Sequence, residues 1–575
     1  MDITITLDFN KPHEKYVHID YQIKWQQSTK TATKLILPSW TPGSYLIRDF
    51  ATHIEAVQAF NDSGDAVAVT KNSKAEWQFA TVGARSLKLR YKVYANDLSP
   101  RAAYCDHELG FVNPAAVLLF PQGALQNPIQ LKIKVPPRWQ LALAKKALRG
   151  SYSFQNFDEL YDTPILTSPL LECRQFKVNS TQYELATFGP HHTDLNHVVA
   201  DLKKIIAKQI PIFGDNPCAR YVFQLIFVKG AYGGLEHCFS STNLFDGLSL
   251  LDAKRYPILM ALLSHEHFHL WNVKRIRPQE LGPFDYTREA YTRELWLAEG
   301  VTSYYDDHTL LRAGVYSTTA YLEVIAENIE KLLSGKGAQL NSLSEASFDA
   351  WIRYYRPNEN SLNTSVNYYL KGGLVGLLLD LEIIKKSRGR ATLDDVMREL
   401  YRRFKSRPEV GITRGEFFAV VESLTGCTFQ EFVAKYIDGT TAIDWQKAFA
   451  EFGIVLETDK KTKESYFLGL TLKDLAGKVV IDKISEDTPS FHSILQSGDE
   501  IIAINGERMD TLKKIDVVDR SPKVKVLFAR RGLVYDTEFT LVKKSTAAKK
   551  LVISQKITSQ QKKYLNLFLR RSSKG

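Results

Sequence analysis

The chain has 575 residues, but only five cysteines and no long hydrophobic run. The cysteines are odd in number, widely spaced and without a C-x-x-C pair, which excludes a disulfide framework and a thiolate metal site. This small number of scattered cysteines fits a protein of a reducing compartment best. The longest apolar stretch starts at Gly372, is interrupted by Asp380 and is too short to cross a bilayer. The first residues also lack the features of a signal peptide, so we expect a soluble, cytoplasmic protein that does not bind membranes.

Acidic residues are absent from the last 35 residues, which contain ten Lys or Arg residues. The whole chain has a formal net charge of +11, with 75 basic and 64 acidic residues, but outside this tail the counts are 65 and 64. The basic excess is therefore confined to the tail, and a charge run of this kind is typical of a solvated terminus. Since the rest of the chain is nearly neutral, we expect no nucleic-acid partner.

Hydrophobic periodicity divides the chain, which is too long for one core, into regions of different structure. Residues 1–9, 86–94 and 129–135 alternate between apolar and polar side chains, which predicts an N-terminal β-sandwich. From about residue 194 the period becomes helical, apart from a continuous apolar strand at residues 220–228. The centre of the chain is therefore predicted to be an α/β region followed by a helical lobe.

Histidine is scarce, with 13 in the chain, yet three lie within the segment SHEHFH. On a helix, His265 and His269 project from the same face, where two imidazoles can bind one cation. Glu266 can then reach a zinc-bound water without being a ligand, as the general base of an H-E-x-x-H site does. His267 points roughly the opposite way, so we do not expect it to be a ligand; it should be a packed or a surface histidine.

A hydrolytic zinc ion needs a third protein ligand, and Glu299 in the segment ELWLAEGVTSYYDD is the candidate. It lies among apolar residues on a predicted helix, although a charge at a helix N-terminus is the alternative. Asp306 falls two turns later on the same face, where it could accept the distal N–H of a ligand histidine. A solvated aspartate is the alternative for Asp306. Two histidines and a glutamate favour one Zn²⁺ ion per chain.

These motifs together resemble a known family. H-E-x-x-H followed by W-L-x-E-G is the pattern of the gluzincin metallopeptidases. The segments HEHFHLWNVKRIRP, WLAEGVTSYYDD and WTPGSYLIRDF are similar to those of the glycyl aminopeptidase family of gluzincins. Between His269 and Glu299 lie 29 residues, more than in the best-known gluzincins, and this length fits the glycyl aminopeptidase branch.

The resemblance implies a multidomain α+β protein. We expect an N-terminal β-sandwich domain in residues 1–165 and a thermolysin-like catalytic domain with the zinc site in residues 166–315. A helical lobe in residues 316–455 would complete the active site. A PDZ-like β domain would follow in residues 456–545, and a basic tail with a short helix in residues 546–575.

Substrate-binding residues also follow from the resemblance. The segment GGLEH is similar to the G-x-M-E-N element of related aminopeptidases, which implies that Glu236 holds the α-ammonium of the substrate beside Gly233 and Gly234. Leu235 replaces the methionine of that element and His237 replaces its asparagine. A glycine turn with a solvated glutamate is the alternative.

A second segment, NYYLKGG, resembles the Y-x-K-G element, whose tyrosine stabilises the tetrahedral oxyanion. Tyr369 is the residue in register, and Tyr368 is the adjacent alternative. Either tyrosine could instead be part of the hydrophobic core, since large aromatic side chains often serve for packing.

The C-terminal region resembles a PDZ domain. The segment YFLGLTL is similar to a PDZ carboxylate-binding loop, and Asn505-Gly506 predicts a β-hairpin. Such a domain can capture a peptide by strand addition, although it can also be a packed accessory domain without a ligand. Thr558 and Gln561 form a capping-box pattern, which predicts a short helix docked on a neighbouring element.

The sequence thus predicts a zinc-dependent aminopeptidase with Glu266 as the general base. The resemblance suggests that it removes small residues, Gly or Ala, from peptides with a free N-terminus, and that the PDZ domain can bind a peptide. One alternative is a zinc endopeptidase with PDZ-directed substrate capture. The other is a catalytically inert PDZ peptide-binding protein, against which the intact set of ligands and base argues.

Overall fold

The structure is a computed structural model that describes residues 1–458, 464–512, 521–545 and 549–570. The chain divides into two compact units, which are described separately. Unit 1 consists of Met1–Thr292, Tyr305–Tyr316 and Asp394–Val420, and unit 2 consists of Arg293–Tyr304, Ser317–Leu393 and Val421–Gly575.

Two β-sheets at the start of unit 1 enclose one hydrophobic core. Alternate residues of β1 (Asp2–Asp8) are buried in it, because successive side chains of a strand face opposite sides. Trp77 and Phe79 of the second sheet join this core, so the two sheets form a sandwich. The first sheet has the order β13-β11-β1-β2-β7-β4, with β2 (Tyr16–Lys24), β4 (Ile54–Phe60), β7 (Ser86–Tyr94), β11 (Ile129–Lys134) and β13 (Tyr152–Phe154). The second has the order β10-β3-β6-β5, with β3 (Thr33–Ile36), β5 (Val69–Lys71), β6 (Glu76–Phe79) and β10 (Phe120–Pro121).

The strands predicted at residues 1–9, 86–94 and 129–135 are confirmed as β1, β7 and β11. The strands of a third sheet alternate along the chain with the last strands of the sandwich. Its order is β12-β14-β9-β8, with β8 (Ala103–Cys105), β9 (Gly110–Val112), β12 (Gln140–Ala142) and β14 (Ile165–Ser168), and α1 (Phe157–Tyr161) precedes β14.

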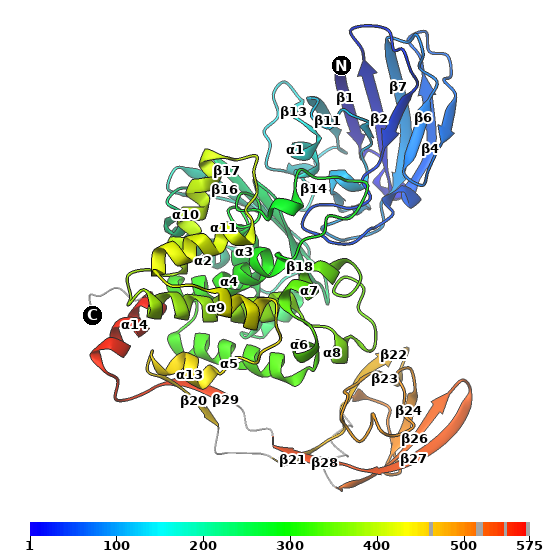
Figure 1. The fold of residues 1–575 in the computed structure, drawn as a ribbon. Coiled ribbons are helices and arrows are strands. Elements are labelled where there is room, and N and C mark those ends of the chain that lie inside the picture. Colours follow the sequence, from blue (N-terminus) through cyan, green and yellow to red (C-terminus); the bar gives the residue numbers. More distant parts are fainter. Residues whose placement is uncertain (459–463, 513–520, 546–548, 571–575) are drawn as a thin grey trace. The chain divides into compact units, whose positions relative to one another are not determined.

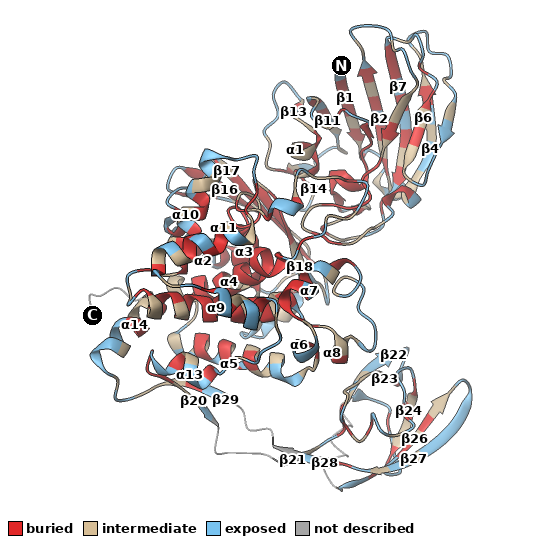
Figure 2. Cartoon of the chain, viewed as in Figure 1, coloured by how far each residue is buried: buried red, intermediate tan, exposed pale blue. Residues whose placement is uncertain are grey.

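A five-stranded mixed sheet forms the centre of unit 1. Its order is β15-β16-β17-β19-β18, with β15 (Glu172–Val178), β16 (Thr181–Phe188), β17 (Arg220–Phe227), β18 (Tyr232–Glu236) and β19 (Ser240–Phe245). The apolar run of β17 is almost wholly buried, as expected for a strand that is covered on both faces (Figure 2). The edge strand β18 runs antiparallel to β19. Helix α2 (Leu195–Phe213) connects β16 to β17, and α3 (Arg255–Phe268) follows β19 and contacts β18.

Helices dominate the chain from α3 to residue 450. The π-helical turn η6 (Trp296–Gly300) leads directly into α4 (Val301–Ala313). In unit 2, α9 (Tyr368–Lys386) packs against η6. The other helices of this part of the chain, in both units, are α5 (Thr318–Ser334), α6 (Gly337–Leu340), α7 (Leu343–Phe348), α8 (Ser361–Thr364), α10 (Leu393–Ser406), α11 (Arg414–Thr425), α12 (Gln430–Phe432) and α13 (Trp445–Ala450).

The C-terminal part of unit 2 contains the predicted β domain. Asn505 and Gly506 have φ angles of 50° and 82°, so they form the expected tight hairpin turn. The sheet order is β22-β23-β24-β26-β27, with β22 (Leu470–Leu475), β23 (Lys478–Ile484), β24 (Glu500–Ile504), β25 (Glu507–Arg508) paired to β24, β26 (Lys523–Arg530) and β27 (Leu533–Thr540). A separate ladder joins β21 (Glu464–Phe467) to β28 (Val542–Ser545).

The end of the chain returns to the helical region of unit 2. Strand β29 (Lys549–Ile553) pairs with β20 (Ile454–Thr458), and α14 (Ser559–Phe568) follows. The predicted capping box of Thr558 and Gln561 is confirmed, and Phe568 is buried against Phe452. Of the expected basic tail, residues 546–548 and 571–575 lie outside the described residues.

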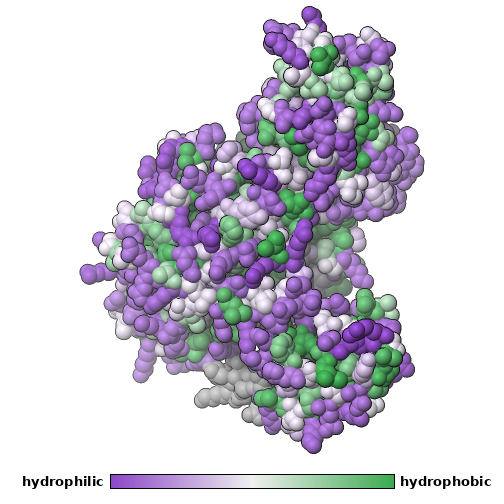
Figure 3. All heavy atoms as spheres, turned by 45° about the vertical axis from the view of Figure 1, so that its right-hand side comes forward, coloured by the Kyte–Doolittle hydropathy of each residue, from purple (hydrophilic) through white to green (hydrophobic). Residues whose placement is uncertain are grey.

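Across the described ranges, every helix is too short or too polar to cross a membrane. On the face shown in Figure 3, hydrophilic side chains cover most of the surface, and hydrophobic ones gather in small separate patches.

Candidate metal centre and active site

The two histidines of the H-E-x-x-H motif lie at the C-terminal end of α3. His265 belongs to the last turn of the helix, and His269 follows Phe268 with helical angles, φ −60° and ψ −17°. Because four residues make about one helical turn, both rings lie on the same side, with centroids 4.6 Å apart. Both side chains are buried.

Each ring is oriented by a hydrogen bond at Nδ1. The Nδ1 of His265 lies 3.0 Å from Oδ2 of Asp306 on α4, and the Nδ1 of His269 lies 2.7 Å from the carbonyl oxygen of Asn272. A carbonyl or carboxylate oxygen only accepts, so each Nδ1 carries the proton. Each Nε2 of a neutral ring then has a lone pair available for a cation.

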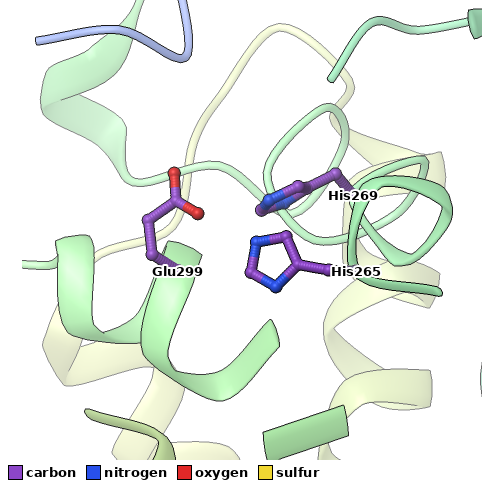
Figure 4. A group of neighbouring side chains, drawn as sticks. All are labelled: His265, His269 and Glu299. Atoms are coloured by element: carbon purple, nitrogen blue, oxygen red, sulfur yellow. The ribbon is translucent and has the colours of Figure 1, made fainter. Parts of the chain in front are cut away.

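Glu299 completes a buried group of three possible ligands. One ligand atom of each of His265, His269 and Glu299 lies within 4.8 Å of the others, and Figure 4 shows the carboxylate turned toward the two rings. Ligand atoms around a tetrahedral Zn²⁺ ion are about 3.3 Å apart, so small adjustments would suffice. The donor chemistry, the burial and the oriented rings all fit one metal ion.

The backbone around Glu299 is set by a close contact between two elements of unit 2. Glu299 lies in the π-helical turn η6, and the next residue, Gly300, lies against α9. A β-carbon on Gly300 would lie 2.5 Å from the α-carbon of Gly372. Glycine at both positions is therefore required for this approach, which accounts for a glycine in each of the segments LAEG and LKGG.

Glu266 and Glu236 form a second group with His269. One atom from each of these three residues lies within 4.8 Å of the others, and both carboxylates are buried. Glu236 comes from the edge strand β18, which passes directly over Glu266. A β-carbon on Gly234 would lie only 2.1 Å from Oε1 of Glu266, so a glycine is needed at this position.

The two adjacent tyrosines differ in accessibility. Tyr368 is fully buried, whereas Tyr369 keeps part of its surface exposed. The Asn367 side chain caps α9 by accepting hydrogen bonds from the N–H groups of Tyr369, at 2.8 Å, and Leu370. Burial, and then the nearby charge of Glu299, raise the pKa of Tyr369 well above 10. Its hydroxyl therefore stays protonated and can donate a hydrogen bond.

Two other polar residues of these motifs have structural contacts. As expected, His267 is a buried packed histidine, with Nδ1 2.5 Å from Oε1 of Gln209, and burial lowers its pKa to about 3. Lys371 donates to the carbonyl oxygens of Ala338 and Asn341 at 3.2 and 3.1 Å, and burial lowers its pKa to about 8.

A buried charge cluster beside Glu236 was missed from the sequence. Asp162 accepts hydrogen bonds from Lys274 Nζ at 2.8 Å, His237 Nδ1 at 3.1 Å and the N–H of Cys238 at 2.7 Å. Burial alone would raise the pKa of Asp162, but the Lys274 ammonium and His237 outweigh it and hold that pKa well below its usual range. The only sequence clue was the departure at His237, because the other members come from distant segments.

A buried group of two histidines and one glutamate, built on an H-E-x-x-H helix, defines a metallopeptidase. The family profile described as M61 glycyl aminopeptidase matches residues 258–375, and the profile of the peptidase M61 N-terminal domain matches residues 4–169. A PDZ domain profile matches residues 457–526. The chain belongs to the M61 glycyl aminopeptidase family, and the resemblance and the multidomain α+β fold class inferred from the sequence are confirmed.

Solved structures provide the second comparison. A crystal structure of an aminopeptidase N family protein from Idiomarina loihiensis has 28% identity and a TM-score of 0.91, and the match covers 99% of this chain and 100% of that chain. The M1 zinc metallopeptidase from Deinococcus radiodurans has 12% identity and a TM-score of 0.48 over 77% and 94% of the two chains. Yeast LTA4 hydrolase in complex with bestatin has 12% identity and a TM-score of 0.45 over 78% and 67%. No curated protein matches the chain.

Proposed function

We propose that the protein is a zinc aminopeptidase that removes small N-terminal residues, Gly or Ala, from peptides. Family membership supports the reaction, and the grouping of Glu236 with Glu266 and His269 within 4.8 Å carries the proposal. A carboxylate at that distance from the proposed base and from a proposed metal ligand can hold a free ammonium group next to the scissile bond. The preference for small residues comes from the family resemblance alone.

The metal site supplies the electrophile. When bound by His265, His269 and Glu299, a Zn²⁺ ion would polarise the scissile carbonyl and lower the pKa of water. Asp306 and the Asn272 carbonyl keep the two imidazoles in the tautomer that this binding requires.

Glu266 and Tyr369 act on the reacting atoms in this proposal. A carboxylate oxygen of Glu266 takes a proton from the attacking water and passes it to the nitrogen of the leaving amine. The Tyr369 hydroxyl donates a hydrogen bond to the oxygen that becomes negative in the transition state. Its raised pKa is consistent with a donor that stays protonated, and its partial exposure favours it over the fully buried Tyr368.

Substitution of Glu236 distinguishes the aminopeptidase proposal from the endopeptidase alternative. Replacement of Glu236 by Ala or by the isosteric Gln should cost activity on Gly- and Ala-arylamides, while cleavage of N-acetylated peptides should stay at the wild-type level. Glu266→Gln should abolish the activity on the arylamides but keep the metal. If the Glu236 variants cleave free-amine substrates as well as wild type does, the aminopeptidase proposal is wrong.

The PDZ domain suggests a second binding activity. We infer that it binds the carboxylate terminus of a peptide, as PDZ domains do by strand addition. Fluorescence anisotropy of the full-length protein with labelled peptides tests this proposal. Peptides with a free C-terminal carboxylate should bind more tightly than the same peptides as amides, and equal affinity would contradict it.

A further inference from the structure

A tight turn of the N-terminal domain lies against the proposed amine-binding residue. Thr41, Pro42, Gly43 and Ser44 form this turn, and the N–H of Ser44 donates to the carbonyl oxygen of Thr41 at 3.1 Å. Pro42 occupies the second position and Gly43, with φ +82°, the third, which is the arrangement of a type II turn. The sequence Pro-Gly thus fixes the local backbone.

Side chains from other segments of unit 1 hold this turn in place. The indole N–H of the fully buried Trp40 donates to the carbonyl oxygen of Asp285 at 2.8 Å. Asn113 Nδ2 donates to Thr41 Oγ1 at 3.3 Å, and Arg48 Nη2 donates to Ser44 Oγ at 3.0 Å. A turn with these supports keeps its position and can act as a fixed wall.

Gly43 touches the Glu236 carboxylate directly. A β-carbon built on Gly43 would lie 2.6 Å from each of the two carboxylate oxygens and 2.7 Å from Cδ1 of Leu235. The carboxylate therefore has the backbone of the turn on one side, and a ligand can approach it only from another side.

The same domain also holds the strand that carries Glu236. Arg101 Nη2 donates to the carbonyl oxygen of Gly234 at 2.9 Å, and Asp162 accepts from the N–H of Cys238 at 2.7 Å. These contacts lie two residues before and two residues after Glu236. The segment Gly234–Cys238, which begins in β18, is thus bound to the N-terminal domain on both sides of the proposed amine-binding residue.

We propose that the turn Thr41–Ser44 is the end wall of the substrate groove and positions the Glu236 carboxylate for the substrate ammonium. This inference rests on the proposed role of Glu236. With the wall in contact with the carboxylate, a peptide cannot extend past its free amine, so the N-terminal domain restricts the enzyme to the first residue. Gly43 is a positioning residue, because it acts through Glu236.

The variant Gly43→Ala tests whether the turn acts as an end wall, and Gly83→Ala is the matched control. Gly83 has nearly the same angle, φ +81°, and a β-carbon there would have no heavy atom within 4 Å. Both variants therefore strain the backbone equally, but only Gly43→Ala pushes on Glu236. The probes are glycine hydroxamate, which has an amine and a metal-binding group, and acetohydroxamate, which lacks the amine. Calorimetry on the full-length, zinc-loaded proteins gives the dissociation constants.

Wild type and Gly83→Ala should bind glycine hydroxamate more tightly than acetohydroxamate. Because a misplacement of about 1 Å can cost as much as about 100-fold, Gly43→Ala should weaken glycine hydroxamate binding at least about tenfold and leave acetohydroxamate binding within about twofold. If Gly43→Ala weakens the binding of both probes equally, or of neither, the proposal that the turn is an end wall is refuted. If wild type does not distinguish the two probes, the proposed role of Glu236 fails first.

A second variant covers the case in which Gly43→Ala does not fold. Pro42→Ala removes the restraint on φ at the second turn position and adds no atom near Glu236. It should weaken glycine hydroxamate selectively, by a smaller factor than Gly43→Ala, because the turn becomes less rigid. If a folded Pro42→Ala variant has the same ratio of the two dissociation constants as wild type, the proposal that the turn is an end wall is also refuted.

Discussion

Gly234→Ala should remove most of the catalytic activity without removing the metal. The added β-carbon would lie 2.1 Å from Oε1 and 2.4 Å from Cδ of Glu266, whereas ordinary contacts are 3.4 Å or longer. The carboxylate would have to move by about 1.3 Å, and a misplacement of about 1 Å can cost about 100-fold in rate. That loss corresponds to about 2.7 kcal/mol of transition-state stabilisation.

The assay is kcat for Gly- and Ala-arylamides, combined with the zinc content of each purified variant. Gly415→Ala is the control, because the nearest atom to its β-carbon would be Thr413 Oγ1, at an ordinary 3.8 Å. The control should match wild type, and both variants should keep one zinc ion per chain. If Gly234→Ala keeps full kcat with zinc bound, then Glu266 is not the base or the strand does not approach it as described.

Three further predictions follow from single contacts. Asp306→Asn should weaken zinc binding about 10- to 100-fold in a chelator competition, because His265 loses the carboxylate at its Nδ1; wild-type affinity would contradict this. Tyr369→Phe should lower kcat about 100-fold or more with little change in KM, whereas Tyr368→Phe should leave kcat unchanged. The opposite result would mean that Tyr368, and not Tyr369, donates the hydrogen bond to the oxyanion. The pKa of Lys371 is lowered to about 8 in the folded protein. Between pH 8 and the ordinary pKa of lysine, the unfolded state therefore binds more protons than the folded state. The free energy of unfolding of wild type, compared with that of Lys371→Met, should consequently increase as the pH rises through this range. Denaturant unfolding of both proteins at several pH values measures this gain, and a constant difference would refute it.

The metal ligands could be inferred from the sequence because each depends on local order. His265 and His269 share a helix, so their spacing alone brings the rings together. Glu299 was found through the motif around it and not through geometry. Its π-helical turn was not predictable, since that turn accompanies packing against α9, whose Gly372 lies more than 70 residues further along the chain.

The surroundings of Glu236 could not be inferred, because they depend on long-range packing. Thr41–Ser44, Arg101 and Asp162 come from three separate segments of the N-terminal domain. A Pro-Gly pair is typical of a turn, but periodicity and propensity report only what a segment does locally. They do not indicate which side chain lies opposite the turn.

Glycines allow the close backbone contacts that place the carboxylates of the site, and they also explain why these contacts could not be predicted from the sequence. Gly43 lies against Glu236, Gly234 lies against Glu266, and Gly300 follows Glu299 and lies against α9. Each of the three carboxylates is thus placed by a backbone that approaches more closely than any side chain would allow. A glycine in a sequence is compatible with a turn, a cap or a close contact, and only the fold tells which. Glycine-to-alanine substitutions at these positions should therefore be strongly damaging, although alanine is the smallest change available there.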